Sequence, residues 1–306
     1  MVNFQRQLEK NQEQVIACCE AYLPQHTKMG DQITLQEEIV EGMSYALLSG
    51  GKRLRPVFML EAFRLFNNEK NYEMLMPFLA SIEYIHNYSL VHDDLPCMDN
   101  DTMRHGMDST WYKYGEGKGV LIGDAILNYA FETALKSFDA ANEENQCFVI
   151  NAMKVLAHKA GIFGMMGGQA VDVSLTNRAI TEEELDFIYR LKTGALLEAS
   201  FMIGGIIAGA SKEQVAQLEL IAKKVGFAFQ IQDDILDITA TESELGKPIN
   251  SDERNHKTTY VSLFGIEKAK EQIEQLSKEA VSLLDTLPGD KEFMVTLIHS
   301  LIGRTK

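Results

Sequence analysis

Apolar residues recur at the spacing of an α-helix along nearly the whole chain. Leu185 and Ile188 follow this period, as do Leu218, Ile221 and Val225, and no segment combines two-residue alternation with flanking turns. With 45% hydrophobic residues among 306, the chain has ample material for a large core. No linker-like or repeated segment divides it. We therefore predict an all-α fold over 1–306, a single large helical bundle that can hold a ligand site in its centre.

Charge and hydropathy argue against several classes of protein. Lys and Arg number 29 against 44 Asp and Glu, a net charge of −15, which disfavours binding to nucleic acid or to anionic lipid. The most apolar run, 195–210, is 16 residues long and contains Glu198, which indicates a buried core helix. The polar start of the sequence lacks the apolar stretch of a signal peptide. We expect a cytoplasmic protein without stable membrane insertion.

Two aspartate clusters, about 140 residues apart, are the strongest chemical signal. They are Asp93, Asp94 and Asp99 in HDDLPCMD, and Asp233, Asp234 and Asp237 in QDDILD. Both clusters lie in apolar, aromatic sequence, where so much negative charge would be costly without a counter-ion. Oxygen-only ligand sets suit hard divalent cations, and Mg²⁺ above all when a phosphate shares the ligand shell. Taken alone, either cluster could equally be an acidic helix face exposed to solvent, without a metal ion.

The two clusters are spaced differently. Asp233 and Asp237 are four residues apart, so in a helix they share one face, with Asp234 beside them. Pro96 interrupts the first cluster, because a proline ring clashes with the carbonyl four residues earlier in a helix. We therefore expect Asp99 to reach back towards Asp93 from a distorted turn.

Fixed cations accompany the acids. GGKRLRP (50–56) places three positive charges in a glycine-fronted turn before a helix, and Arg104 follows the first acidic cluster. Lys192 lies in the middle of the chain and Lys247 follows the second cluster. Cations together with a metal ion are what a diphosphate requires. The turn is not a nucleotide-binding loop, since Arg rather than Ser or Thr follows Gly-Lys and no G-x-G-x-x-G occurs.

In combination these motifs resemble the trans-isoprenyl diphosphate synthases, and in particular the short-chain bacterial farnesyl diphosphate synthase type. The resemblance runs from GGKRLRP to the final GRTK, through IHNYSLVHDDLPCMD, MMGGQAVD, LKTGALL and FQIQDDILD. It implies the isoprenoid synthase type of helical bundle, with a central substrate cavity, a homodimer, and Mg²⁺ bound between the two aspartate motifs. It implies that an allylic diphosphate ionises to a carbocation, which the double bond of isopentenyl diphosphate attacks.

The resemblance also assigns roles. The six aspartates correspond to metal and diphosphate ligands. Positions that contact the allylic diphosphate correspond to Arg104, Lys192, Thr193, Gln230 and Lys247, of which Lys192, Thr193 and Gln230 are the expected catalytic residues. The isopentenyl diphosphate site corresponds to Lys52, Arg55 and His86, and to His105 at a position where the family carries a second arginine. Because histidine is mostly neutral above its pKa of about 6.5, we expect this site to be weaker and sensitive to pH.

The length of the product depends on which side chains block the growing prenyl chain. Tyr88 lies five residues before Asp93, slightly more than one helical turn, so it would stand beside the growing chain. Relatives with an aromatic residue there are similar in stopping at C15, which favours (2E,6E)-farnesyl diphosphate. Geranyl (C10) and geranylgeranyl (C20) diphosphate synthases, and a weakly active partner subunit of such an enzyme, remain alternatives. A terpene cyclase is disfavoured, since the resemblance implies only one DDxxD there and no GGKRLRP.

Overall fold

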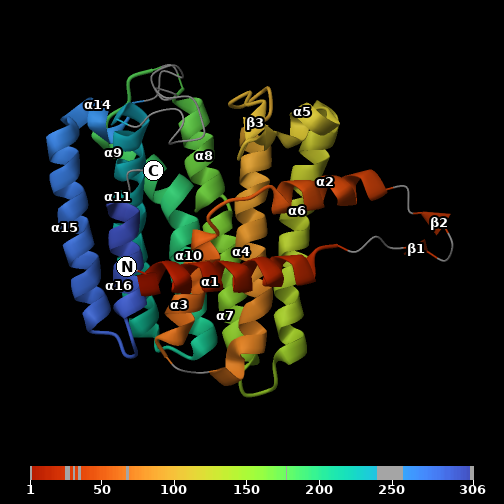
Figure 1. The fold of residues 1–306 in the computed structure, drawn as a ribbon, viewed down its shortest axis with the longest axis horizontal. Coiled ribbons are helices and arrows are strands. Elements are labelled where there is room, and N and C mark those ends of the chain that lie inside the picture. The colour runs from red at the N-terminus through yellow and green to blue at the C-terminus, as the bar shows by residue number, and fades with distance from the viewer. Residues whose placement is uncertain are drawn as a thin grey trace. The chain divides into compact units, whose positions relative to one another are not determined.

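The computed structural model describes residues 2–24, 28–29, 32–33, 36–66, 69–176, 178–239 and 258–303. Its elements form two compact units, Met1–Val57 with Glu73–Gln146, and Phe58–Tyr72 with Cys147–Lys306. Apart from two short hairpins, the described elements are helices, which confirms the predicted all-α class (Figure 1). The prediction of one domain over 1–306 stays a prediction.

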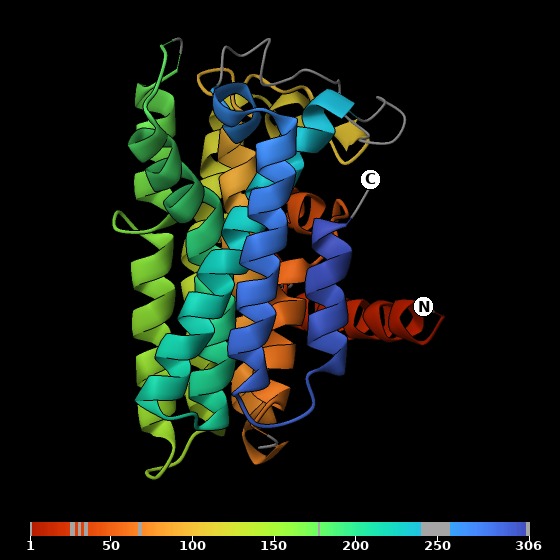
Figure 2. The same ribbon diagram turned by 90° about the vertical axis from the view of Figure 1, so that its left-hand side faces the viewer.

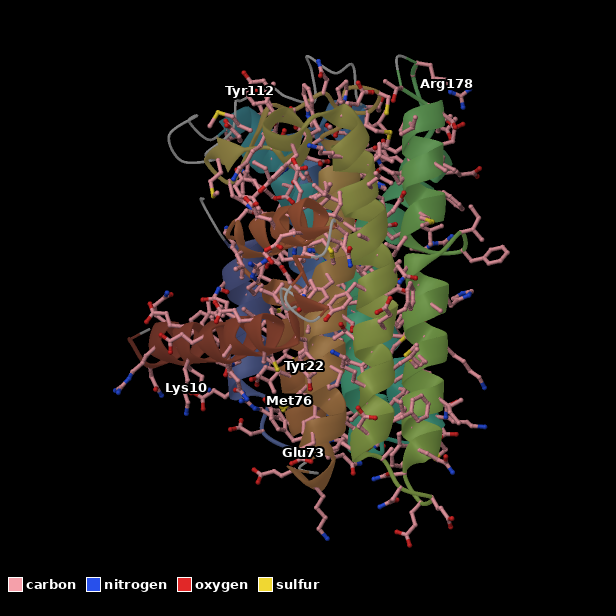
Figure 3. The ribbon with its side chains drawn as sticks, turned by 90° about the vertical axis from the view of Figure 1, so that its right-hand side faces the viewer. Lys10, Tyr22, Glu73, Met76, Tyr112 and Arg178 are labelled. Carbon is pink, nitrogen blue, oxygen red and sulfur yellow. The ribbon has the colours of Figure 1, made fainter. Side chains whose placement is uncertain are left out.

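The first unit is built on the long helix α4. Its elements are α1 (Val2–Tyr22), β1 (Lys28–Met29), β2 (Gln32–Ile33), α2 (Glu37–Leu48), the first residues of α3 (Leu54–Arg64), α4 (Tyr72–Asp93), β3 (Met103–Arg104), β4 (Met107–Asp108), α5 (Thr110–Tyr114), α6 (Glu116–Leu135) and η2 (Lys136–Ala140). Helix α1 crosses α4 at a steep angle, and Cys18 Sγ lies 3.7 Å from the carbonyl oxygen of Met76, labelled in Figure 3. The hydroxyl of Tyr84, a fully buried residue, donates to the carbonyl of Cys19 at 2.6 Å.

The second unit surrounds the apolar helix α10. Its elements are the remainder of α3, η1 (Glu69–Asn71), α7 (Gln146–Ala160), α8 (Met165–Ser174), α9 (Glu182–Ile188), η3 (Tyr189–Gly194), α10 (Ala195–Ala208), α11 (Lys212–Thr239), α14 (Tyr260–Phe264), α15 (Ile266–Asp285) and α16 (Glu292–Ile302). Helix α11 packs against both α10 and α15 (Figure 2). Two helix starts in this unit are capped by side chains: Thr181 and Glu184 form a reciprocal capping box, and Ser211 and Gln214 exchange the equivalent hydrogen bonds.

Helix α10 carries most of the apolar run that was expected to be a core helix. Among the described residues, the continuous helical run Glu182–Ala208 is long and apolar enough to span a membrane by length and composition. However, 78% of its most apolar window is buried inside the protein, as in a core helix. Glu198, the one charge within this helix, is buried and pairs with Lys159 on α7.

Candidate functional site

The first aspartate cluster lies where α4 ends. As Pro96 predicted, the helix stops at Asp93 and the chain turns back, so that the backbone N–H of Asp99 donates to the carbonyl oxygen of Asp93 at 2.8 Å. Asn100 takes a left-handed conformation with φ 55°, which lets the chain leave the turn. The turn thus brings the two ends of the motif next to each other, six residues apart in sequence.

Within this cluster Asp94 is different. It is 2% exposed and is held by the guanidinium of Arg104, with Nε donating to Oδ1 at 3.1 Å and Nη2 to the same oxygen. Burial raises the pKa of Asp94 more than Arg104 lowers it. Asp94 therefore anchors Arg104, while Asp93 and Asp99 stand on more exposed positions of the turn. The metal-ligand role of all three stays a prediction.

Arg104 and His105 lie in a hairpin that the sequence did not reveal. Strands β3 and β4 are antiparallel and pair Arg104 with Met107, and the two intervening residues have positive φ, 51° at His105 and 80° at Gly106. This is the conformation that a tight two-residue hairpin requires. Histidine is enriched among non-glycine residues with positive φ, so the residue that departs from the family pattern suits the backbone that it occupies.

The GGKRLRP turn has the glycine-fronted form that the sequence predicted. Gly50 and Gly51 have φ of 109° and 108°, and α3 begins at Leu54. The imidazole of His105 lies against this turn, because a Cβ added to Gly51 would be 3.5 Å from its Cε1. The turn and the hairpin, about 50 residues apart in sequence, thus form one surface.

Arg53 belongs to GGKRLRP, and no role was predicted for it from the sequence. In the structure it holds the turn in place. It is 6% exposed, donating from Nη1 to Glu83 Oε1 and from Nη2 to the carbonyl of Leu47, both at 2.7 Å. These contacts fix the turn, in which Lys52 is exposed and Arg55 is half-buried. Arg53 itself has a φ of 51°, an uncommon conformation that its buried contacts maintain.

Around His86 lie two of the other predicted isopentenyl diphosphate residues, Arg55 and His105. Burial lowers the pKa of His86 well below its ordinary value, and the positive charges of Arg55, Arg53, His105 and Arg104 lower it further. His105 has a lowered pKa for the same reasons, burial first and then Arg104 and Arg53. Such a concentration of positive charge around neutral imidazoles is suited to a multiply charged anion.

The predicted catalytic residues assemble in the second unit. Lys192 and Thr193 lie on η3, a single π-helical turn between α9 and α10. Thr193 Oγ1 donates to Gln230 Oε1 on α11 at 2.7 Å, and Lys192 Nζ donates to Asp172 Oδ2 on α8 at 2.5 Å. Helical periodicity predicted a continuous helix here, and the π-turn is a local widening of the kind that often occurs at functional sites.

A glycine explains how α8 approaches η3 so closely. A Cβ at Gly168 would overlap the backbone nitrogen of Lys192 and lie 2.8 Å from its Cα. Gly168 and Asp172 both belong to MMGGQAVD, so the motif was visible in the sequence although its relation to Lys192 was not. Together they position the backbone and the ammonium group of Lys192.

The second aspartate cluster lies on α11, as predicted, with Asp233 half-buried and Asp234 and Asp237 buried. Tyr189 donates to Asp234 Oδ2 at 2.5 Å, and the backbone N–H of Tyr260 donates to the same oxygen at 2.8 Å. The sequence had no signal for this role of Tyr189. Lys247 lies outside the described residues.

A cavity of about 150 Å³, lined by both polar and apolar side chains, joins these groups within the second unit. Its polar lining comprises Asp172, Thr176, Arg178, Lys192, Thr193, Gln230, Asp234, Thr258 and Thr259. Arg178, labelled in Figure 3, follows α8 and pairs with Glu184 at 2.7 Å. The cavity offers an ammonium, a guanidinium, hydroxyls and an amide together, which suits a phosphate-bearing ligand.

Mg²⁺ fits the donor chemistry of the aspartate motifs, which present only carboxylate oxygens. In the described part of the chain, no three His, Cys, Asp or Glu side chains form a cluster that could hold a metal ion by themselves. Tyr88, the expected determinant of chain length, is 4% exposed on α4 and packs edge-to-face on His92 at 5.7 Å. Burial, and then the charge of Asp93, raise its pKa to about 12, so its hydroxyl stays neutral.

Comparison with known proteins places these sites in a family. The chain is 36% identical over 275 residues to the farnesyl diphosphate synthase of Bacillus subtilis, covering 90% of this chain and 91% of the relative. It is 42% identical to a chloroplastic geranylgeranyl pyrophosphate synthase of Capsicum annuum, covering 83% and 68%. Among solved structures, a geranyltransferase of Helicobacter pylori complexed with magnesium and isoprenyl diphosphate has a TM-score of 0.77 and 30% identity, covering 95% and 96%.

A family model described as polyprenyl synthetase matches residues 36–295, which include both aspartate clusters, the GGKRLRP turn and the Lys192–Thr193 segment. Since the match takes in the cation turn, the π-helical turn and both acidic motifs in one continuous alignment, this chain is a prenyltransferase that belongs to the polyprenyl synthetase family.

Proposed function

We propose that this chain is a Mg²⁺-dependent (2E,6E)-farnesyl diphosphate synthase. It condenses isopentenyl diphosphate head-to-tail with dimethylallyl diphosphate and then with geranyl diphosphate. The observation that carries the proposal is the pair of contacts Lys192–Asp172 and Thr193–Gln230, whose residues line one cavity together with Asp234. These groups would bind the allylic diphosphate, together with Arg104 and Lys247.

The reaction needs charge stabilisation on the departing diphosphate. The carboxylates of Asp93, Asp99, Asp233 and Asp237, with Asp94 and Asp234 beside them, would hold Mg²⁺. When bound, Mg²⁺ neutralises the negative charge that develops on the diphosphate as the C–O bond breaks. Lys192, oriented by its ion pair with Asp172, adds a positive charge at the same group. The magnesium complex of the H. pylori geranyltransferase supports this choice of ion.

Isopentenyl diphosphate would bind at the surface formed by the GGKRLRP turn and the β3–β4 hairpin. Lys52, Arg55 and His105 supply positive charge or hydrogen bonds there, and neutral His86 can donate one hydrogen bond to the anion. The carbocation formed from the allylic substrate requires an apolar surrounding free of water.

The C15 product rests on Tyr88, a buried aromatic residue one turn before Asp93. The specific competitor is a C20 product, because several relatives with about 40% identity are named geranylgeranyl synthases. A C10 product would require an earlier stop. We further propose a cytoplasmic homodimer. The remaining alternative is a weakly active partner subunit of such an enzyme. In its favour, one relative is named as the large subunit of a heterodimeric synthase.

The test is a product assay with purified protein, Mg²⁺, isopentenyl diphosphate and either dimethylallyl or geranyl diphosphate, resolved by chain length. A C15 product that disappears with EDTA supports both the activity and its length. A C20 product keeps the chemistry and refutes the role given to Tyr88. Absence of product from either starter across pH 5.5 to 8 refutes the synthase proposal and favours the partner subunit.

A further inference from the structure

Two segments of the second unit are joined by a pair of side-chain hydrogen bonds. Tyr189 and Thr193 are four residues apart on η3, and Gln230 and Asp234 are four residues apart on α11. Thr193 donates to Gln230 at 2.7 Å, and Tyr189 donates to Asp234 at 2.5 Å. The matched spacing makes the two bonds successive contacts between one face of each segment.

The two contacts are also connected to each other. Gln230 Nε2 donates to Asp234 Oδ1 at 3.4 Å, while Asp234 Oδ2 accepts from the Tyr189 hydroxyl and from the backbone N–H of Tyr260. The same N–H lies 3.1 Å from the Tyr189 oxygen. The Tyr189 hydroxyl thus lies where η3, α11 and the first residue of α14 meet.

Burial gives this arrangement its strength. Tyr189, Asp234 and Tyr260 are 6%, 2% and 7% exposed. A buried carboxylate is held firmly by donors that bond to its charged form, and losing one donor costs more there than at a surface. Because Gln230 is tied to Thr193 through Oε1 and to Asp234 through Nε2, the orientation of its amide depends on where Asp234 stands.

The ring of Tyr189 has a separate role from its hydroxyl. The ring lies 5.8 Å from that of Phe227 and belongs to an apolar cluster with Leu185, Ile188 and Ile231. A phenylalanine at position 189 would keep this packing and remove only the hydroxyl. The hydroxyl's contribution can therefore be measured without removing the ring.

We infer that Tyr189 is a positioning residue, whose hydroxyl fixes the Asp234 carboxylate and, through it, Gln230 for binding of a magnesium diphosphate. This inference rests on the proposed function, since it assigns a task to the same site. Tyr189 lines the same cavity, but in this role its hydroxyl acts by setting the geometry of Asp234 and Gln230.

The experiment compares Tyr189→Phe with the unmodified protein, using inorganic pyrophosphate as the probe. Isothermal titration calorimetry with pyrophosphate in excess Mg²⁺ should show about tenfold weaker binding in the variant, from the loss of one bond to a charged group. Steady-state kinetics should show a higher KM for the allylic diphosphate and a higher Mg²⁺ requirement. The KM for isopentenyl diphosphate, whose proposed ligands lie in the other unit, should be unchanged.

Tyr84→Phe is the matched control. Tyr84 is also buried, and its hydroxyl also donates one short hydrogen bond, to the carbonyl of Cys19 at 2.6 Å. Both variants should lower the melting temperature, but only Tyr189→Phe should weaken pyrophosphate binding. Unchanged binding in Tyr189→Phe, or equal weakening in Tyr84→Phe, overturns the positioning role.

A different result would refute the proposed function itself. If the unmodified protein neither binds magnesium pyrophosphate nor forms a prenyl product, the synthase proposal is wrong and the role of Tyr189 falls with it. If the unmodified protein does both while Tyr189→Phe matches it, only the positioning inference is wrong.

Discussion

The backbone N–H of Asp99 donates to the carbonyl oxygen of Asp93 at 2.8 Å, so the chain that follows α4 turns back to the last residue of the helix. This contact brings together the backbones of two residues that are six positions apart, a separation too long for one helical turn. In the second motif, the outer aspartates are close because they lie at i and i+4 on one helix.

Replacing Asp93 or Asp233 with alanine should abolish most of the activity. Each variant removes an oxygen ligand for Mg²⁺, and the expected loss in kcat is about 10³-fold or more, comparable to losing a main electrostatic contributor. Prenyl transfer measured with radiolabelled isopentenyl diphosphate, and repeated after EDTA treatment, checks this. Asp139→Ala, on η2 outside both motifs, is the control that should retain activity. Retained activity in Asp93→Ala would contradict the assignment.

Tyr88→Ala should lengthen the product. Removing the buried ring opens space about one helical turn before Asp93 on α4, so chains of C20 or longer should appear in the product pool. Tyr88→Phe keeps the volume and should leave the product length unchanged, which separates steric bulk from the hydroxyl. Thin-layer or mass-spectrometric resolution of the dephosphorylated products is the measurement. An unaltered product from Tyr88→Ala would show that another residue limits chain growth.

Affinity for isopentenyl diphosphate should rise as the pH falls from 8 towards 5.5. Burial and then the neighbouring arginines lower the pKa of His105, so its imidazole is neutral at pH 7 to 8 and gains positive charge only on acidification. Binding a dianion favours the protonated form, and the expected gain in affinity is roughly five- to tenfold over this range. The pKa of His86 lies well below its ordinary value, so His86 stays neutral over most of it.

Two variants isolate His105 from the ionisation of the ligand itself. His105→Asn keeps a residue that tolerates positive φ and should remove the pH dependence that belongs to the imidazole. His105→Arg should bind more tightly at pH 8, because its charge is permanent. An affinity that is flat across pH 5.5 to 8 and unchanged in His105→Arg would show that His105 does not touch the substrate.

Gly168→Ala should impair catalysis through the backbone of Lys192. The added methyl group would overlap the nitrogen of Lys192, so η3 must shift, and a displacement near 1 Å can cost about 10²-fold in kcat. Gly117→Ala on α6 is the control, because a Cβ there meets nothing within 4 Å. It should retain the activity of the unmodified protein. Comparable activity in both alanine variants would refute the close-approach argument.

Lys159→Met should destabilise the protein by about 3 kcal/mol, because it leaves the carboxyl group of Glu198 buried without its cation. Although burial lowers the pKa of Lys159, its bonds to Glu198 and Glu219 raise it above the ordinary value, so the ammonium is charged in the folded state. Denaturant unfolding measures the change. Lys278→Met, which breaks an exposed pair with Glu274, should change stability by less than about 0.5 kcal/mol.

The double variant Lys159→Met with Glu198→Leu gives a further check. Removing both charges replaces a buried ion pair with apolar groups, so it should cost clearly less than Lys159→Met alone. A double variant that is less stable than the single one would mean that packing, rather than the unpaired charge, dominates.

The sequence by itself determined the helical class, the two aspartate motifs and the turn at Pro96, because these follow from local rules of periodicity, ring clash and spacing. The capping boxes at Thr181 and Ser211 depend on equally local sequence, three residues apart in each case. Family membership also followed from the order of motifs along the chain.

Only the tertiary structure decided which groups meet across long separations. Asp172 reaches Lys192 over 20 residues, Tyr189 reaches Asp234 over 45, and His105 lies against Gly51 over more than 50. The single π-turn at Tyr189–Gly194 was also hidden, since one widened turn leaves the apolar period of its flanking helices intact. Such contacts arise from the packing of whole helices, and a one-dimensional pattern records which face is apolar but not which partner it meets.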